Sequence, residues 1–365
     1  MKLLCDRQQL QEAFAIVAGI VPAKSPKPIL QSVLVRAEKD SVVFFSTDLE
    51  MAARVTLDSV KVSQPGRVLL PARETGALLR EIADPTISLE TKEFRCEIES
   101  GGGTFILLGE DPEQFPAEKA FTGERQVALP GGVLLDMLRR TTFAAAKEES
   151  RYAVNGALIE VKNDCLHIVA TDGRRLALCY QHLDGKSPAC RAVVPTRILQ
   201  ALMRAIPEGM KDPVTILFTG NQIAFSLGKT MLVSRLLEAN FPDYETVIPK
   251  ACETTVEVNR ALLESNLRKV AVLADGDVRM VKMSFNSSSI GLSAESSGKG
   301  RADLVMDADV KGTGGSLGFN PDFVLEGLRA SELDVVRIEI GDDATPAKFA
   351  LGEAYTYIVM PISGS

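Results

Sequence analysis

LLPAR at residues 69–73 returns as VVPTR at residues 193–197, an interval of about 124 residues. At both places the proline stands directly before a helix-like pattern. STD at residues 46–48 returns as ATD at residues 170–172 at the same interval, and both triplets follow a strand-like alternation of apolar and polar residues. An interval this long is not the period of a solenoid, so it indicates successive domains that each bury a core.

A third copy of the pattern is weaker but in phase. Residues 281–292 alternate like a strand, and GFNP at residues 318–321 opens a further helix-like stretch. Three repeats of about 120 residues fill the 365-residue chain. We therefore predict three domains, at residues 1–120, 121–249 and 250–365, which are called repeats 1, 2 and 3 below.

Each repeat follows one order of elements: an opening strand, a helix, a hairpin, a second helix that a proline starts, and another hairpin. The predicted helices cover residues 8–20, 72–82, 132–142, 196–206, 260–273 and 322–330. The fold is thus predicted to be α+β, with three pseudo-repeated domains that each set two helices beside antiparallel sheets. Six such domains from two chains would leave a bore of roughly 35 Å, wide enough for a DNA duplex. The alternative is a bent rod of three domains.

The composition excludes several classes of protein. With 45% hydrophobic and 24% charged residues the chain is globular rather than disordered. Its six cysteines form no CxxC pair or small-domain disulfide pattern, and two histidines offer little for a metal site or a catalytic triad. No apolar stretch reaches 18 residues, so we expect a cytoplasmic protein with no membrane anchor, no metal and no cofactor.

The net charge of −7 argues at first against a nucleic-acid partner. The charge is uneven, however: it is −4 in repeat 1, +2 in repeat 2 and −5 in repeat 3. Arg73 and Arg80 share one face of a predicted helix, and Arg197 and Arg204 repeat that spacing. These pairs indicate cationic stripes; the alternative is an ordinary solvated helix face whose arginines pair with acids beside them.

Two other function classes stay open at this point. The glycine runs at residues 101–103 and 312–315 suggest an enzyme, but neither precedes a helix with a phosphate-binding lysine, and hairpin turns explain them. A scaffold protein without DNA contacts is the stronger rival, because the acidic total favours it.

Four motifs together resemble one known family. They are ATDGRRLA at residues 170–177, NFPDYETVIP at 240–249, GFN at 318–320 and YIVMPI at 357–362. In this order they resemble the bacterial sliding clamps, the beta subunits of DNA polymerase III, along essentially the whole chain. The resemblance implies a ring-shaped homodimer that encircles double-stranded DNA without sequence preference. It also implies an accessory subunit with no catalytic residues of its own.

The resemblance further implies protein partners. These are the DNA polymerase III alpha subunit, the clamp loader complex and other proteins of replication and repair, which would bind through short motifs rich in Leu and Phe. The expected pocket lies between repeats 2 and 3, and its apolar members have ordinary core positions as the alternative. Its residues are Thr171, Gly173, Arg174, Arg175, Leu176, Pro242, Val247, Asn320, Phe323, Ile358, Met360, Pro361 and Ile362.

Position by position, the resemblance also assigns two other surfaces. The expected DNA contacts are Lys24, Arg73, Arg80, Arg151, Tyr152, Arg197 and Arg204. The expected dimer interface joins Phe105 and Ile106 of one chain to Arg268, Lys269, Val272 and Leu273 of the other. Arg174 stands where many members have histidine, and Phe323 where tyrosine is frequent, so the preferred peptide motif is expected to differ.

Overall fold

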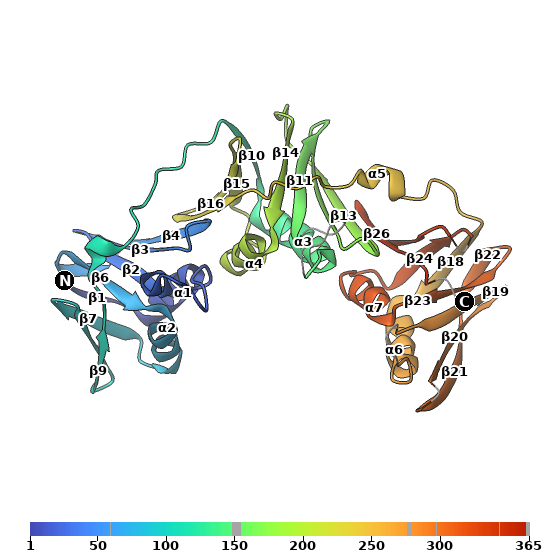
Figure 1. The fold of residues 1–365 in the computed structure, drawn as a ribbon, viewed down its shortest axis with the longest axis horizontal. Helices are drawn as coiled ribbons and strands as arrows, with labels where there is room; N and C mark the ends of the chain where they lie inside the picture. The colour runs from blue at the N-terminus through green and yellow to red at the C-terminus, as the bar shows by residue number, and fades with distance from the viewer. Residues whose placement is uncertain (59, 148–154, 276–278, 297, 343, 363–365) are drawn as a thin grey trace. The chain divides into compact units, whose positions relative to one another are not determined.

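The computed structural model describes residues 1–58, 60–147, 155–275, 279–296, 298–342 and 344–362. The chain forms two compact units, each of which collects its residues from two segments. Unit 1 contains Met1–Leu135 and Arg197–Leu236, and unit 2 contains Asp136–Thr196 and Leu237–Ser365. Each unit holds two antiparallel sheets and its own helices (Figure 1).

Unit 1 contains a five-stranded and an eight-stranded sheet. The smaller sheet has the order β5 (Lys61–Gln64), β1 (Lys2–Asp6), β7 (Thr86–Lys92), β8 (Arg95–Ser100), β9 (Gly103–Leu108). The larger has the order β10 (Arg125–Pro130), β15 (Pro213–Phe218), β16 (Gln222–Leu227), β17 (Thr230–Arg235), β4 (Met51–Asp58), β3 (Ser41–Thr47), β2 (Ser32–Ala37), β6 (Gly66–Pro71). Helix α1 (Arg7–Ala18) packs on β3, β4 and α2 (Ala72–Glu81).

Unit 2 contains a nine-stranded and a four-stranded sheet. The larger has the order β14 (Cys190–Pro195), β11 (Gly156–Lys162), β12 (Cys165–Thr171), β13 (Arg175–His182), β26 (Tyr355–Val359), β25 (Ala347–Gly352), β24 (Val335–Ile340), β18 (Thr254–Asn259), β22 (Asp309–Gly312). The smaller has the order β21 (Gly300–Asp307), β20 (Ser289–Ser296), β19 (Val281–Asn286), β23 (Gly315–Phe319). Helix α6 (Arg260–Ala271) packs on α7 (Pro321–Arg329) and on β20 and β21.

Three further elements complete the list of helices. Helices α3 (Gly131–Thr141) and α4 (Thr196–Ala205) cross the division between the units, and α5 (Tyr244–Val247) is a single turn. Short 3₁₀ helices cover Pro28–Gln31 (η1), Pro112–Gln114 (η2) and Thr142–Ala144 (η3).

The predicted α+β class and every predicted helix are confirmed. The helices end earlier than predicted: the expected helix at residues 260–273 ends at Ala271. Polar caps fix the starts, because the side chains of Asp6 and Asn259 accept backbone N–H groups in the first turns of α1 and α6. The apolar pattern continues past the last hydrogen-bonded turn, which is why it overstates helix length.

Neighbouring repeats share sheets. Strand β17 of repeat 2 pairs with β4 of repeat 1, and β13 of repeat 2 pairs with β26 of repeat 3. Each large sheet therefore crosses from one repeat to the next, and this strand pairing is called a joint below. Unit 1 is built around the joint of repeats 1 and 2, and unit 2 around the joint of repeats 2 and 3. The chain consequently groups into two compact units although its sequence repeats three times, and the two exact domain boundaries stay a prediction.

Candidate functional site

The turn between β12 and β13 carries the first residues of the predicted peptide pocket. The Thr171 hydroxyl donates to the backbone oxygen of Arg175 at 2.6 Å. The carboxylate of Asp172 accepts the backbone N–H groups of Arg174 and Arg175 at 2.9 and 3.1 Å. Gly173 has a φ of +83°, a left-handed conformation that glycine adopts at little cost. These bonds fix the turn and leave Gly173 and Arg174 exposed.

Arg175 lies behind this turn, buried to 6% exposure. Its guanidinium donates to Asp172 at 3.1 Å, to the carboxylate of Glu326 and to the backbone oxygen of Phe143 at 2.9 Å. The Cζ atom also lies 4.5 Å from the ring centroid of Phe323, a cation–π distance. The sequence predicts Arg175 as a pocket wall, whereas the structure uses its polar groups to tie β13 to α7.

The C-terminal segment that follows β26 is hydrogen-bonded to the same turn. The backbone N–H of Met360 donates to the oxygen of Arg174 at 2.8 Å, and that of Ile362 donates to Gly318 at 2.8 Å. Asn320 caps α7, because its side-chain oxygen accepts the N–H of Asp322 at 2.9 Å. Residues that are far apart in the sequence therefore meet at one site.

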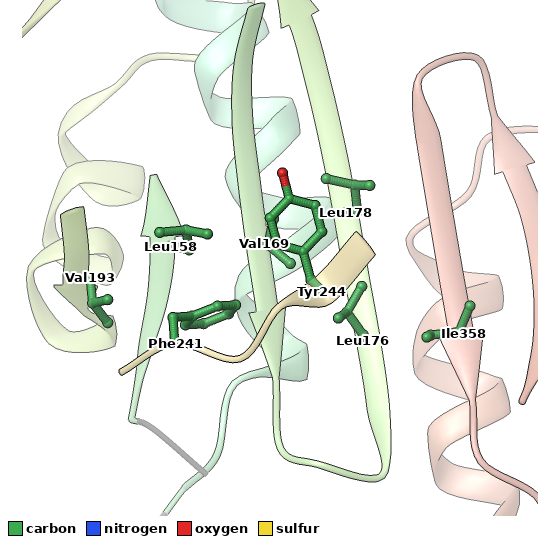
Figure 2. Close-up of a cluster of buried hydrophobic side chains, with 8 residues drawn as sticks. All are labelled: Leu158, Val169, Leu176, Leu178, Val193, Phe241, Tyr244 and Ile358. Carbon is green, nitrogen blue, oxygen red and sulfur yellow. The ribbon is translucent and has the colours of Figure 1, made fainter. Parts of the chain in front are cut away.

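A buried cluster forms the floor of this site (Figure 2). Leu176 and Ile358 pair across β13 and β26, and they are only 2% and 4% exposed. Figure 2 shows Tyr244 of α5 close to Leu176 and Leu178. The members of the cluster are Leu158, Val169, Leu176, Leu178, Val193, Phe241, Tyr244 and Ile358. Leu176 and Ile358 thus belong to the core, as the alternative interpretation of apolar residues has it.

The hydroxyl of Tyr244 donates to Glu160 at 2.9 Å. Burial, followed by this hydrogen bond to a carboxylate, raises the pKa of Tyr244 above its usual range. The hydroxyl therefore stays protonated at neutral pH and holds α5 on the cluster.

Five predicted pocket residues remain exposed around the cluster. Val247 and Met360 are the large apolar ones, at 44% and 40% exposure. The other three exposed residues are Gly173, Arg174 and Pro242. Four more of the predicted pocket residues are half-buried: Asn320, Phe323, Pro361 and Ile362. Met360 is hydrogen-bonded to the backbone of Arg174, so an exposed apolar side chain lies beside an exposed arginine, which suits an apolar peptide with an acidic group.

Two of the predicted DNA contacts of unit 1 line a cavity of about 820 Å³ between α1 and α2. Arg73 and Arg80 line it from α2, and both are exposed. The loop that carries Lys24 contributes further lining residues, and Lys24 is exposed as well. Arg151 and Tyr152 lie outside the described residues.

Arg197 is held differently from Arg73. Its guanidinium donates to the Asp48 carboxylate at 2.5 Å and to the backbone oxygen of Ile20 at 2.5 Å. The Asp48 side chain is 11% exposed, so this ion pair is partly shielded from solvent. Arg204 lies over Gly19 at the end of α1 and is exposed. Helical spacing predicts the face of each arginine, but no local signal reveals a partner 149 residues away.

The predicted dimer residues lie on two elements. Phe105 and Ile106 are 39% and 43% exposed on the edge strand β9, and Val272 is 71% exposed after α6. Arg268 pairs with Glu264 of its own helix, Lys269 donates to Asn266, and Leu273 is half-buried.

Sequence reasoning missed two exposed residues at the sheet edges, Leu108 at 77% on β9 and Val305 at 73% on β21. An outward-facing apolar residue in an edge hairpin is the signal that identifies them.

Other kinds of site find no support in the described part of the chain. It contains no group of three or more His, Cys, Asp or Glu side chains placed to hold a metal. No disulfide joins any of the six cysteines, all of which lie in the described part of the chain. None of the described helices has the length and apolar character needed to cross a membrane.

Comparison with known proteins identifies the family. Models of the N-terminal, central and C-terminal domains of the DNA polymerase III beta subunit match residues 1–119, 128–243 and 245–363. The beta sliding clamp of Chlamydia muridarum is 30% identical over 364 residues, which is 99% of each chain. The chain belongs to the beta sliding clamp family. The Escherichia coli K12 clamp is 28% identical over 99% of this chain and 100% of its own.

Solved clamp structures agree in fold. The Bacillus subtilis clamp has a TM-score of 0.92 at 25% identity, and the Pseudomonas aeruginosa clamp, described as bound to griselimycin, has 0.93 at 26%. Both comparisons cover 100% of each chain. As a beta sliding clamp, the protein is a DNA polymerase processivity factor and an accessory partner of DNA polymerase III.

Proposed function

We propose that two copies of this clamp close into a ring that encircles double-stranded DNA without sequence preference. The single observation that carries the proposal is the joint that recurs between repeats, β17 with β4 and β13 with β26. By position in their hairpins, β9 corresponds to β17 and β26, and β21 corresponds to β4 and β13. Both lie at the end of their sheets, so a third joint of the same kind needs a second chain.

The register of this intermolecular joint follows from the two internal ones. Ala52 pairs with Val233 in one joint, and Leu176 pairs with Ile358 in the other. The corresponding residues are Arg301 on β21 and Ile106 on β9. This register sets Phe105 opposite Ala302, on the side of β21 where Met306 meets α6. Val272 then has an apolar neighbour in the assembly, which agrees with the interface that the family resemblance predicts.

Lys24, Arg73, Arg80 and Arg204 are the proposed phosphate contacts, because each is exposed. Contacts of this kind bind any duplex and weaken as salt is added. Arg197 is proposed to act mainly through Asp48, by holding the joint between repeats 1 and 2.

The exposed residues around the buried cluster of unit 2 are the proposed binding site for protein partners. These partners are the DNA polymerase III alpha subunit, the clamp loader complex and other proteins of replication and repair. Val247 and Met360 supply apolar contact area, and Arg174 supplies charge. The protein itself is proposed to work in the cytoplasm and to perform no chemistry, so the loader opens the ring.

Retention on circular DNA tests the proposal. The clamp is loaded by a clamp loader complex onto a nicked circle, excess protein is removed by gel filtration, and half of the sample is cut with a restriction enzyme. A closed ring stays on the circle and leaves the linear DNA within minutes, because it slides off the ends. Equal loss from both samples contradicts encirclement, and no retention on either supports a scaffold without DNA contacts.

A further inference from the structure

Unit 1 contains a second apolar cavity, of about 240 Å³, at the joint of repeats 1 and 2. Its floor is formed by β4 and β17, and the segment at residues 116–121 runs along one side. Its apolar lining includes Leu49, Ala52, Phe121, Met231 and Val233. The volume is below the roughly 300–1,000 Å³ of a drug-sized ligand site, so it suits one or two side chains.

This cavity occupies the position that the predicted peptide site has in unit 2. Ala52 pairs with Val233 as Leu176 pairs with Ile358. The hydroxyl of Thr47 donates to the backbone oxygen four residues later at 2.7 Å, as that of Thr171 does at 2.6 Å. The turns that follow are built alike.

The left-handed residue of the turn differs between the two joints. Leu49 has a φ of +80° where Gly173 has +83°. This left-handed conformation costs free energy for leucine, because its Cβ crowds the backbone, and it costs glycine little. Its side chain is nevertheless 48% exposed at the mouth of the cavity. An exposed apolar side chain held in a strained turn is characteristic of a binding surface.

The cavity exists because the joint in unit 1 lacks three large apolar side chains. Where unit 2 has Leu176, Leu178 and Tyr244 in its buried cluster, unit 1 has Ala52, Arg54 and Glu118. The corresponding cluster of unit 1 contains Leu30, Phe45, Leu69 and Phe115. Arg54 and Glu118 instead form an ion pair at 3.0 Å on the rim. The apolar floor therefore stays open to a ligand.

The charges around the mouth favour an acidic ligand. Glu118 pairs with Arg54, and Glu50 pairs with Arg235 at 3.4 Å, so both acids of the lining already have cationic partners. Lys119 also lines the cavity, is exposed, and has no ion-pair partner among the described residues. The rim is left with one uncompensated positive charge.

The segment at residues 116–121 offers backbone groups as well. Within the described chain it makes no hydrogen bond to other backbone groups, whereas Phe115 before it does. An extended peptide can pair with such a segment while its side chains enter the cavity.

We propose that this cavity is a second docking site, for an extended segment of a partner protein that carries an aliphatic or aromatic anchor next to a carboxylate. The anchor enters between Leu49, Met231 and Val233, and the carboxylate lies at Lys119. One clamp chain then holds two partner segments, one in each unit.

Methionine methyl groups report on the two sites separately, because Met231 lines the cavity and Met360 belongs to the site in unit 2. The full-length protein, labelled with ¹³C at the methionine methyls and assigned by Met→Leu variants, is titrated with the peptide acetyl-Ala-Leu-Asp-Leu-Phe-amide. We expect both resonances to shift. Val233→Glu should abolish the shift at Met231 alone, and the matched variant Val247→Glu the shift at Met360 alone.

Lys119→Glu provides a second test that does not touch the sheet. It should weaken binding at Met231 by roughly two- to fivefold at low salt, the effect of one exposed ion pair, and leave Met360 unaffected. A peptide with Lys in place of Asp should bind the cavity more weakly. Melting temperatures equal to that of the wild type show that each variant is folded.

The outcomes separate this inference from the proposed function. A shift at Met360 alone overturns the second site and leaves the site in unit 2 standing. A shift at Met231 alone supports the second site and counts against the other. No shift at either residue overturns both.

Discussion

Individual arginines show how far a sequence motif determines a role. Arg175 and Arg197 both belong to motifs that indicate a binding surface, yet each forms an ion pair with an acid that repeats by position, Asp172 and Asp48. Removing Arg175, whose side chain is 5% exposed, leaves its acidic partner with an uncompensated charge, which costs more than the pair itself contributes. The Arg197 side chain is 42% exposed, so its pair with Asp48 contributes less. Arg175 also pairs with Glu326 of repeat 3, and Arg197 pairs with Asp48 of repeat 1, so each arginine connects two neighbouring repeats.

His167 makes stability depend on pH. It lies half-buried on β12 against Tyr180, and its Nδ1 is buried without a partner in the described chain. Burial lowers the pKa of His167, and the charge of Glu160 opposes this only in part. The unfolded chain binds a proton near the ordinary pKa of about 6.5, whereas the folded chain does so only at lower pH. The contribution of neutral His167 to the free energy of unfolding is therefore fully present above pH 7. It is lost as the pH falls through the pKa that His167 has in the folded chain.

The expected result is a melting temperature that declines from pH 7 to pH 5 in the wild type and declines less in His167→Gln. His182→Gln, which removes the only other histidine, is the matched control. Equal pH dependence in the wild type and in His167→Gln would show that another group is responsible.

Strands and helices differ in how well the sequence predicts them. The prolines and polar caps fix where α2, α6 and α7 start, and strict alternation identifies the hairpins. Which strand pairs with which across a joint is a long-range property, and alternation carries no information about it. The one-turn helix α5 was not predicted, because four residues are too few for a helical period.

A cysteine pair tests the strand register proposed for the dimer. Ile106→Cys combined with Arg301→Cys, in a chain whose exposed Cys252 is replaced by serine, should form an intermolecular disulfide on mild oxidation. The product is a dimer band on a non-reducing gel.

Ile106→Cys with Asp303→Cys moves one partner by two residues and should crosslink far less, because diagonal neighbours lie about 7–8 Å apart. A stronger band from this shifted pair would assign a different register, and no band from either pair would contradict pairing of β9 with β21.

At the scale of the whole molecule, the net charge of −7 is a sum over the chain and does not give the charge of any one surface. Exposed Arg73 and Arg80 line one cavity of unit 1, and exposed Lys24 lies on a loop that contributes to the same lining. An acidic total is therefore compatible with a DNA partner, provided that the contacts are few and local.

The salt dependence of DNA binding measures those contacts. Each phosphate contact contributes about −0.9 to the slope of log affinity against log salt. The double variant Arg73→Ala/Arg80→Ala should reduce the steepness of that slope by about two, as measured by fluorescence anisotropy on a labelled duplex. Arg197→Ala should leave the slope nearly unchanged and lower the melting temperature, because its partner is Asp48. A reversed pattern would move Arg197 to the DNA surface and remove α2 from it.

The three-fold repeat in the sequence was sufficient to predict the fold class, because each copy has a proline at the start of its second helix. The site was predicted less completely. Ordinary core was the favoured interpretation of Leu176 and Val247 taken alone; Leu176 is buried in the cluster, whereas Val247 is 44% exposed. Burial depends on what a distant segment packs against, and only the folded chain determines that.

The segment at residues 116–121 has one more consequence. It joins repeats 1 and 2 covalently, yet β17 and β4 hold the same two repeats together through a continuous ladder of backbone hydrogen bonds. A protease that cuts this exposed connection would break the chain without separating the pieces. The ladder between β17 and β4, and not the connecting segment, would then keep repeats 1 and 2 associated.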